Sequence, residues 1–245
     1  MTALTIGCGP KTIEPGHVGL DINMTYARAA RALSGRPAVI VGDASRLPFR
    51  SGVFGELQCW EVFEHIEAKE DAVAEFWRVA APGAVLIFST PLAHIERQLA
   101  WISRNYRTSV LETQHRSCLE PRKTLALVSA YFDVDRVWFD PEAFAFCLAA
   151  SWLLDRNRVE FNDAGELVGD NATKVETSAK AFARHFAWAF KVVNRMFRYQ
   201  ATKSICLEAH RRSDAGATPP GKSGGQQPNM SLVSPAHGGA DVNAE

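Results

Sequence analysis

The chain has 245 residues, of which 47% are hydrophobic and 22% charged, the composition of an ordinary soluble globular protein. Lysine plus arginine and aspartate plus glutamate both number 27, so the net charge gives no reason to expect a nucleic-acid partner. The five cysteines show no metal-binding or redox spacing, which favours reduced thiols and a cytoplasmic location. The longest apolar run, residues 143–154, is too short to span a bilayer.

The first ninety residues alternate strand and helix patterns. Apolar runs typical of strands occupy residues 3–6, 17–20, 38–41, 55–60 and 84–89. A helical pattern covers residues 69–79, and Pro82-Gly83 ends it before the fifth strand. Strands and helices at this spacing predict an α/β fold with a parallel sheet.

The second half contains two more expected strands, at residues 131–139 and 203–209. The mostly helical residues between them are too many for a simple loop, so we interpret them as an inserted cap. The last 33 residues lack aromatic side chains and are rich in glycine and proline, which predicts disorder. The expected organisation is a core at 1–139, a helical cap at 140–199, a last core strand at 200–212 and a disordered tail at 213–245.

Four of the expected strands end in glycine or polar residues. Ligands of open α/β sheets bind at the carboxyl ends of the strands, so these residues predict one binding crevice. Gly7 and Gly9 would let backbone amides approach a ligand closely, although a GCGP sequence is also an ordinary turn. Asp21 can accept both hydroxyls of a ribose, and Asp43 can accept an adenine amino group; either could instead cap a helix.

Together these motifs resemble the class I S-adenosylmethionine-dependent methyltransferases. The matching segments are GCGP at 7–10, VGLDI at 18–22, GDASRLPF at 42–49, EHI at 64–66 and RVAAPG at 78–83. The resemblance implies a Rossmann-like seven-stranded sheet whose last strand is antiparallel. It also implies cofactor-binding roles for Gly7, Cys8, Gly9, Asp21, Ile22, Asp43, Ala44, Cys59 and Glu61.

The chain departs from this group near its first glycine. Thr5 stands where many members carry an acidic residue, and Lys11 where many carry glycine. Only eleven residues separate Gly9 from Asp21, so the helix that normally follows the first strand should be very short or absent. A weakened helix amino terminus gives a bound carboxylate less dipole support.

Candidate catalytic residues follow the fourth strand in the sequence EVFEH. This sequence resembles the ExxEH element of ubiquinone-pathway and small-RNA O-methyltransferases, which implies that Glu61, Glu64 and His65 bind magnesium or manganese together with a later histidine, His115. Alternatively, EH only begins the next helix, or His65 or His115 acts as a base on the acceptor. His94 is a third candidate base.

The pattern of basic and apolar residues over 179–199 predicts a basic amphipathic helix. One face carries Lys180, Arg184, Lys191, Arg195 and Arg198, and the other carries Phe182, Phe186, Phe190, Val193 and Phe197. This pattern is typical of a helix on an anionic membrane surface, here the inner face, although it also suits a cap helix packed on residues 143–154. We therefore expect O-methylation of a small or lipid-linked acceptor.

Two other functions compete with methyl transfer. One is a nucleotide- or NAD-binding oxidoreductase, but the dinucleotide fingerprint requires a third glycine where this chain has Thr12. The other is a noncatalytic module that binds the cofactor without turnover. The sequence gives no oligomeric state.

Overall fold

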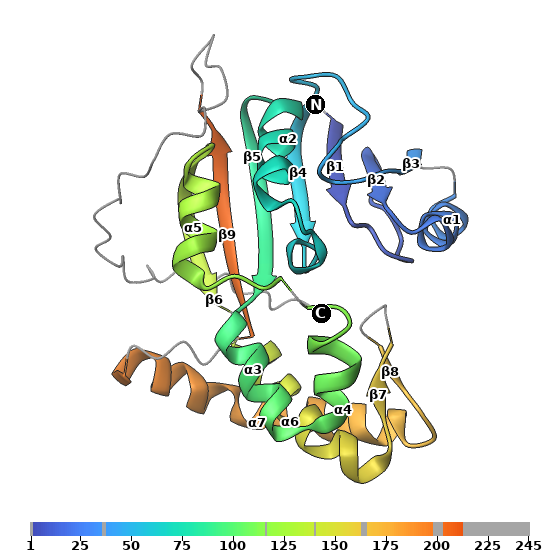
Figure 1. The fold of residues 1–245 in the computed structure, drawn as a ribbon, viewed down its shortest axis with the longest axis vertical. Coiled ribbons are helices and arrows are strands. Elements are labelled where there is room, and N and C mark those ends of the chain that lie inside the picture. Colours follow the sequence, from blue (N-terminus) through green and yellow to red (C-terminus); the bar gives the residue numbers. More distant parts are fainter. Residues whose placement is uncertain are drawn as a thin grey trace, which may run out of the picture.

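The computed structural model describes residues 2–35, 38–115, 117–139, 141–162, 166–197 and 203–212. Within them, one sheet contains seven strands in the order β3-β2-β1-β4-β5-β9-β6 (Figure 1). The strands are β1 (Thr2–Ile6), β2 (His17–Asp21), β3 (Ala38–Val41), β4 (Phe54–Trp60), β5 (Ala80–Pro91), β6 (Phe132–Phe139) and β9 (Ser204–Arg211).

Strands β1 to β5 pair in parallel, whereas β9 is antiparallel to both of its neighbours, β5 and β6. The predicted mostly parallel α/β sheet with an antiparallel last strand is therefore confirmed. Since the parallel strands end at the same edge, the turns that follow β1, β2, β3 and β4 lie along one side of the sheet.

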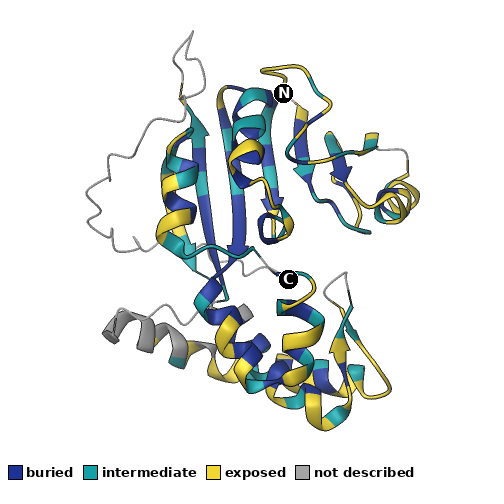
Figure 2. Cartoon of the chain, in the orientation of Figure 1, coloured by how far each residue is buried: buried dark blue, intermediate teal, exposed yellow. Residues whose placement is uncertain are grey.

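Three helices accompany the sheet: α1 (Met24–Leu33), α2 (Lys69–Val79) and α5 (Pro121–Ser129). Helix α2 begins and ends where the sequence predicts, and its apolar positions at 72, 73, 76 and 77 form one buried stripe. This stripe packs against alternate side chains of β4, such as the fully buried Leu57, in one hydrophobic core. In Figure 2 the strands β5 and β9 are coloured mostly as buried.

No helix occurs in residues 7–16, all of which the structure describes. The short link predicted from the spacing of Gly9 and Asp21 is thus confirmed. A loop leads from β1 directly into β2, and the loop residue Ile13 packs with Cys8 and Ala30 in a small separate cluster.

A helical lobe lies beyond the carboxyl ends of β4 and β5 (Figure 1). It contains α3 (Ala93–Ile102), α4 (Arg104–Tyr106), a π-helical turn (Arg107–Leu111), α6 (Pro141–Asn157), α7 (Ala172–Phe197) and a hairpin of β7 (Glu160–Phe161) and β8 (Leu167–Val168). Helix α6 packs along α7 and also contacts α3 and α4. Two helices from before residue 140 therefore join the segment that we expected to form the cap.

Some sequence expectations lie outside the described residues. They concern the tail at 213–245 and residues 198–202 before the last strand. None of the helices in the described part of the chain is long and apolar enough to cross a membrane.

Candidate functional site

The glycine turn after β1 has a left-handed backbone at both glycines, with φ of +64° at Gly7 and +57° at Gly9. A Cβ atom on Gly7 would lie 2.2 Å from Cγ2 of Val62, whereas one on Gly9 would meet nothing within 4 Å. Gly7 is thus required by close packing, and Gly9 leaves open space at the strand end. Cys8 between them is buried, which raises the pKa of its thiol to about 11, and its N–H donates to the Leu20 carbonyl at 3.0 Å.

Asp21 at the end of β2 ties this turn to the second strand. Its Oδ2 accepts the Gly9 N–H and its Oδ1 accepts the Asn23 N–H, both at 2.8 Å. Each carboxylate oxygen can accept a further hydrogen bond. The next side chain, Ile22, is 73% exposed and offers an apolar surface beside the carboxylate. This combination suits a ribose with its attached base.

The loop after β3 presents Asp43 and Ala44. Oδ1 of the exposed Asp43 accepts both the N–H and the hydroxyl of Ser45 at 2.8 Å, which closes a local turn. Ala44 is buried beneath the loop. Asp43 thus makes the kind of side-chain-to-backbone hydrogen bond that also caps helices, here within a turn. Its exposed carboxylate lies on the same sheet edge as Asp21.

Two side chains of α2 hold the continuation of this loop, the LPF segment. Arg78 donates to the carbonyls of Leu47 at 2.9 Å and Phe49 at 2.8 Å, and Glu75 accepts the Leu47 N–H at 2.8 Å. Hydrogen bonds from Arg78 lower the pKa of Glu75, although burial works in the opposite direction. Arg78 is the first residue of RVAAPG, so these hydrogen bonds join that segment to the end of GDASRLPF.

At the end of β4, Cys59 and Glu61 take different places. Cys59 is fully buried in the core, and burial raises the pKa of its thiol. Glu61 has a positive φ of 52°, and its carboxylate accepts hydrogen bonds from Ser89 at 2.7 Å, Ser204 at 3.0 Å and Lys203 at 3.3 Å. The structure thus directs Glu61 toward β5 and β9.

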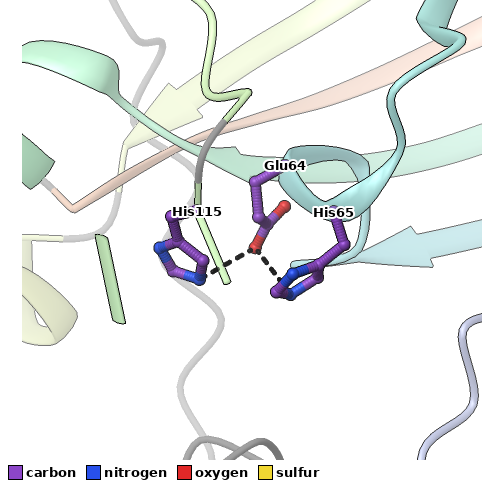
Figure 3. Close-up of side chains that lie close together, drawn as sticks. All are labelled: Glu64, His65 and His115. Atoms are coloured by element: carbon purple, nitrogen blue, oxygen red, sulfur yellow. Dashed lines mark ion pairs between the residues drawn. The ribbon is translucent and has the colours of Figure 1, made fainter. Parts of the chain in front are cut away.

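Glu64, His65 and His115 form a compact cluster (Figure 3), with one ligand atom of each lying within 4.8 Å of the others. Oε1 of Glu64 is 3.9 Å from Nε2 of His65 and 3.8 Å from Nε2 of His115. Glu64 is 1% exposed, and this Oε1 atom has no hydrogen-bond partner within the described chain. Three of the four residues predicted to bind a metal are therefore together, and Glu61 is not among them.

The hydrogen bonds of the two imidazoles determine which nitrogen faces Glu64. Nδ1 of His65 lies 2.9 Å from the Gln114 carbonyl, and Nδ1 of His115 lies 2.7 Å from Oε2 of Glu96. Both partners are acceptors, so we assign the proton of each neutral imidazole to Nδ1. The bare Nε2 atoms then face Glu64 Oε1, and separations near 3.9 Å are too long for a proton to bridge them.

The burial of the cluster acts on its protonation. Burial, together with the nearby charge of Glu61, raises the pKa of Glu64 well above its usual value. Burial and the neighbouring His115 lower the pKa of His65. Both shifts disfavour charge on these side chains when no cation is bound.

Lys69 and Ser117 hold the two halves of the cluster together. The ammonium group of Lys69, a buried residue, donates to the carbonyls of Phe63 and Ile66 and to the hydroxyl of Ser117. Ser117 in turn donates to the Glu64 carbonyl at 2.7 Å. These contacts fasten the turn that carries Glu64 to the segment that follows His115.

Sequence reasoning missed several residues of this region, namely Lys69, Glu96, Tyr106, Ser117 and Lys203. One signal was available for Glu96, because it falls on the apolar stripe of α3 between Ile95 and Leu99. The remaining candidate, His94, lies 3.3 Å from Glu120 and is not part of the cluster.

A cavity of about 150 Å³ lies beside the glycine turn, lined by residues that include Thr5, Cys8, Lys11, Gln58 and Trp60. Ligand pockets usually measure about 300–1,000 Å³. This cavity is therefore too small to hold a nucleoside cofactor by itself.

Residues 4–88 match the family described as "Methyltransferase domain". Norajmaline N-methyltransferase of Rauvolfia serpentina is 37% identical over 95 residues, which are 39% of this chain and 30% of that protein. Ajmaline N-methyltransferase of the same plant is 36% identical over 95 residues, 39% of this chain and 31% of that protein. The chain thus matches under a third of the length of these relatives.

Solved structures share the fold at low identity. A geranyl diphosphate C-methyltransferase from Streptomyces coelicolor A3(2), in complex with Mg²⁺, geranyl-S-thiolodiphosphate and S-adenosyl-L-homocysteine, superposes with a TM-score of 0.52 and 12% identity, covering 86% of this chain and 69% of that one. The [4+2]-cyclase SpnF gives 0.51 and 17%, covering 87% and 75%. These similarities establish the fold alone.

Residues 4–88 are thus similar to methyltransferase domains, and the solved structures share the fold of the chain. The family match ends at residue 88, before His115 and the helical lobe. It therefore includes the glycine turn, Asp21, Asp43, Glu64 and His65.

Proposed function

We propose that the chain transfers the methyl group of S-adenosylmethionine to a small-molecule acceptor. The observation that carries the proposal is the gathering of the glycine turn, Asp21 and Asp43 on one sheet edge, within the segment that matches a methyltransferase domain. Asp21 would accept the ribose hydroxyls, Asp43 would face the adenine, and the open space at Gly9 would admit the amino-acid end.

The reaction itself needs little covalent help from the protein. A lone pair of the acceptor attacks the methyl carbon, the carbon–sulfur bond breaks and its electron pair stays on sulfur, while an acceptor hydroxyl loses its proton to a base. Holding the reactants at attack distance supplies much of the rate. In the absence of a bound cation, the bare Nε2 of the half-exposed His65 would be the group that accepts that proton.

Calorimetry with S-adenosylmethionine and S-adenosylhomocysteine tests the proposal. We expect both to bind, and we expect Asp21→Ala to weaken binding by about 1.5–3 kcal/mol, the worth of hydrogen bonds to a charged group. Asp71→Ala, which removes an exposed carboxylate from α2, is the matched control.

Two outcomes would contradict methyl transfer. Thermal stabilisation by nicotinamide cofactors but not by S-adenosylmethionine would indicate an oxidoreductase. Binding of S-adenosylmethionine without transfer of labelled methyl to any fraction of a cell extract would indicate a noncatalytic module.

We further infer that Glu64, His65 and His115 hold a divalent cation, manganese or magnesium. Within the described residues, no hydrogen bond joins the three ligand atoms that face one another here, so a positive ion would satisfy all three. Two ligands that each lie about 2.1 Å from one metal are at most about 4.2 Å apart, and the two carboxylate-to-imidazole distances are shorter than this limit. A bound cation would lower the pKa of an acceptor hydroxyl, which favours oxygen methylation.

Titration with Mn²⁺, followed by electron paramagnetic resonance, tests the metal site. We expect stoichiometric binding to the wild type, loss of binding in Glu64→Gln, and no change in Glu67→Gln, whose glutamate is exposed three residues away. Magnesium, zinc and iron(II) serve as competitors because imidazole ligands also suit zinc and iron. Full methylation activity in excess chelator would overturn this inference.

The exposed side of α7 supports a lipid-linked acceptor and contact with an anionic membrane surface. Lys180 and Arg184 are exposed on its basic side, whereas Val175, Ala179 and Ala183 are buried on the apolar side, where α7 packs on α6. Phe186, further along the apolar side, and Trp188 are also exposed. The remaining basic and apolar residues of the predicted pattern have side chains outside the described part of the chain: Phe190, Lys191, Val193, Arg195, Phe197 and Arg198.

Co-sedimentation with vesicles tests this contact. We expect binding to phosphatidylglycerol-containing vesicles and not to pure phosphatidylcholine, with a loss in the double variant Lys180→Glu and Arg184→Glu. Full activity on a water-soluble acceptor without vesicle binding would contradict it.

A further inference from the structure

Glu96 of α3 is a carboxylate with no exposed surface, and it receives two hydrogen-bond donors. The hydroxyl of Tyr106 lies 3.0 Å from its Oε1 and 2.9 Å from its Oε2, and Nδ1 of His115 lies 2.7 Å from Oε2. Tyr106 and His115 are themselves buried. The three side chains come from α3, α4 and the segment after the π-helical turn, so they meet only in the folded chain.

Such a buried carboxylate needs a reason, because an apolar side chain of similar volume often gives equal or greater stability. Glu96 lies 2.7 Å from Nδ1 of His115, and the Tyr106 hydroxyl is within hydrogen-bond distance of both of its oxygens. Glu96 is therefore the acceptor that keeps the Nδ1 proton of His115 in place.

The contact also fixes how the imidazole is turned. With Nδ1 bound to Glu96, the opposite nitrogen of the same ring, Nε2, faces Glu64 Oε1 at 3.8 Å. Metal-binding histidines commonly donate their other ring N–H to a carboxylate, which sets both the tautomer and the ring orientation.

We propose that Glu96 and Tyr106 are positioning residues that orient His115 for a divalent cation held with Glu64 and His65. This inference rests on the proposed metal site. Tyr106 acts through Glu96, because its hydroxyl donates to both carboxylate oxygens and fixes the plane of the carboxylate. Glu96 acts through His115.

The helical lobe supports this arrangement from behind. Asp155 of α6 accepts the N–H groups of Arg104 and Asn105 at 2.8 Å and the hydroxyl of Ser103 at 2.9 Å. The Ser103 hydroxyl oxygen accepts the Tyr106 N–H at 3.0 Å. The short helix that carries Tyr106 is thus anchored to α6, so the position of His115 depends on the packing of the lobe.

Mn²⁺ affinity provides the first test, measured by electron paramagnetic resonance on the full chain. We expect Glu96→Gln to bind Mn²⁺ about 10–100-fold more weakly than the wild type, the usual effect of losing an outer partner of a metal-binding histidine. Tyr106→Phe should weaken binding less, since it leaves the charge of Glu96 in place. Glu160→Gln, which changes an exposed glutamate of the lobe, should bind like the wild type.

Side-chain nitrogen NMR provides a second readout that a purely structural role would not change. In metal-free wild-type protein we expect the His115 signals of the Nδ1–H tautomer, and in Glu96→Ala a mixture of tautomers. If Glu96→Ala does not fold, Tyr106→Phe and Glu96→Gln still test the proposal through their Mn²⁺ affinity.

The outcomes separate the two proposals. A wild type that binds S-adenosylmethionine but no Mn²⁺ would refute the metal site and this inference with it. Wild-type binding of Mn²⁺ with an unchanged affinity in Glu96→Gln would refute only the positioning role.

Discussion

The proposed site has two halves, a cofactor side and an acceptor side, and they are built in different ways. On the cofactor side, the glycine turn and Asp21 are joined by backbone N–H groups, and the polar residues directly follow their strands. On the acceptor side, His115 is far in sequence from Glu64 and His65, and buried side chains create the geometry. The first half is thus specified locally, whereas the second depends on how the lobe packs.

The halves also differ in how well their carboxylates are satisfied. Both oxygens of Asp21 accept backbone N–H groups, so this carboxylate is held in place before a ligand binds. Oε1 of Glu64 is buried without a partner within the described residues, and two imidazole nitrogens face it. The acceptor side therefore gains the most from a bound cation.

The largest expected effect is on the glycine turn. Gly7→Ala should lower the free energy of unfolding by about 2–5 kcal/mol, because left-handed backbone strain adds to a clash with Val62. Gly9→Ala carries similar strain without the clash, so it should cost only about 1–2 kcal/mol. Urea unfolding measures both, and equal losses would show that close packing does not set this side of the crevice.

An intermediate effect is expected where Lys69 joins the parts of the acceptor side. Lys69→Met leaves two carbonyls and the Ser117 hydroxyl without their charged donor, so we expect a loss of about 1–3 kcal/mol in unfolding free energy. Lys174→Met removes an exposed lysine and serves as the control. In Lys69→Met, Mn²⁺ affinity should fall together with stability, and in Lys174→Met neither should change. An unchanged Mn²⁺ affinity in Lys69→Met would show that the hydrogen bonds of Lys69 do not position the cluster of Glu64, His65 and His115.

The smallest expected effect concerns the pH dependence of the cofactor side. The folded-state pKa of Glu75 is lowered below its usual 4.5, chiefly by hydrogen bonds from Arg78. The contribution of ionised Glu75 to the free energy of unfolding is thus fully present above about pH 4.5. It is lost as the pH falls through the lower folded-state pKa. Since these side chains are 21% and 31% exposed, we expect only about 1 kcal/mol.

Thermal unfolding between pH 3 and 6 checks this prediction. The wild type should lose more stability than Glu75→Gln as the pH falls below 4.5. Glu70→Gln, an exposed glutamate on the same helix, should follow the wild type. Parallel curves for the wild type and Glu75→Gln would contradict the role assigned to this pair.

The sequence predicted the sheet well because strand periodicity and turn residues are local signals. The strand at 38–41 and the helix at 69–79 match the structure at both ends, and the missing helix before β2 followed from a simple count of residues. The sequence did not predict α1, or that α3 and α4 would pack with α6.

The candidate site likewise has a part that local sequence signals predict and a part that they do not. Asp21 and the glycine turn could be expected to meet, because the parallel strands that they follow end at one edge. The resemblance to ExxEH implies that Glu61 binds the metal together with Glu64 and His65. In the structure, Glu61 has a positive φ and its carboxylate pairs with Lys203. That ion pair joins residues from opposite ends of the chain, which no local pattern reveals.

The contacts of α3 and α4 with α6 have a practical consequence for engineering. The lobe is assembled from two separate stretches of the chain, one before β6 and one after it. Excising only the later stretch would leave the sides of α3 and α4 that face α6 open to water. An attempt to transplant the substrate specificity of this protein onto another scaffold would therefore have to move both stretches together.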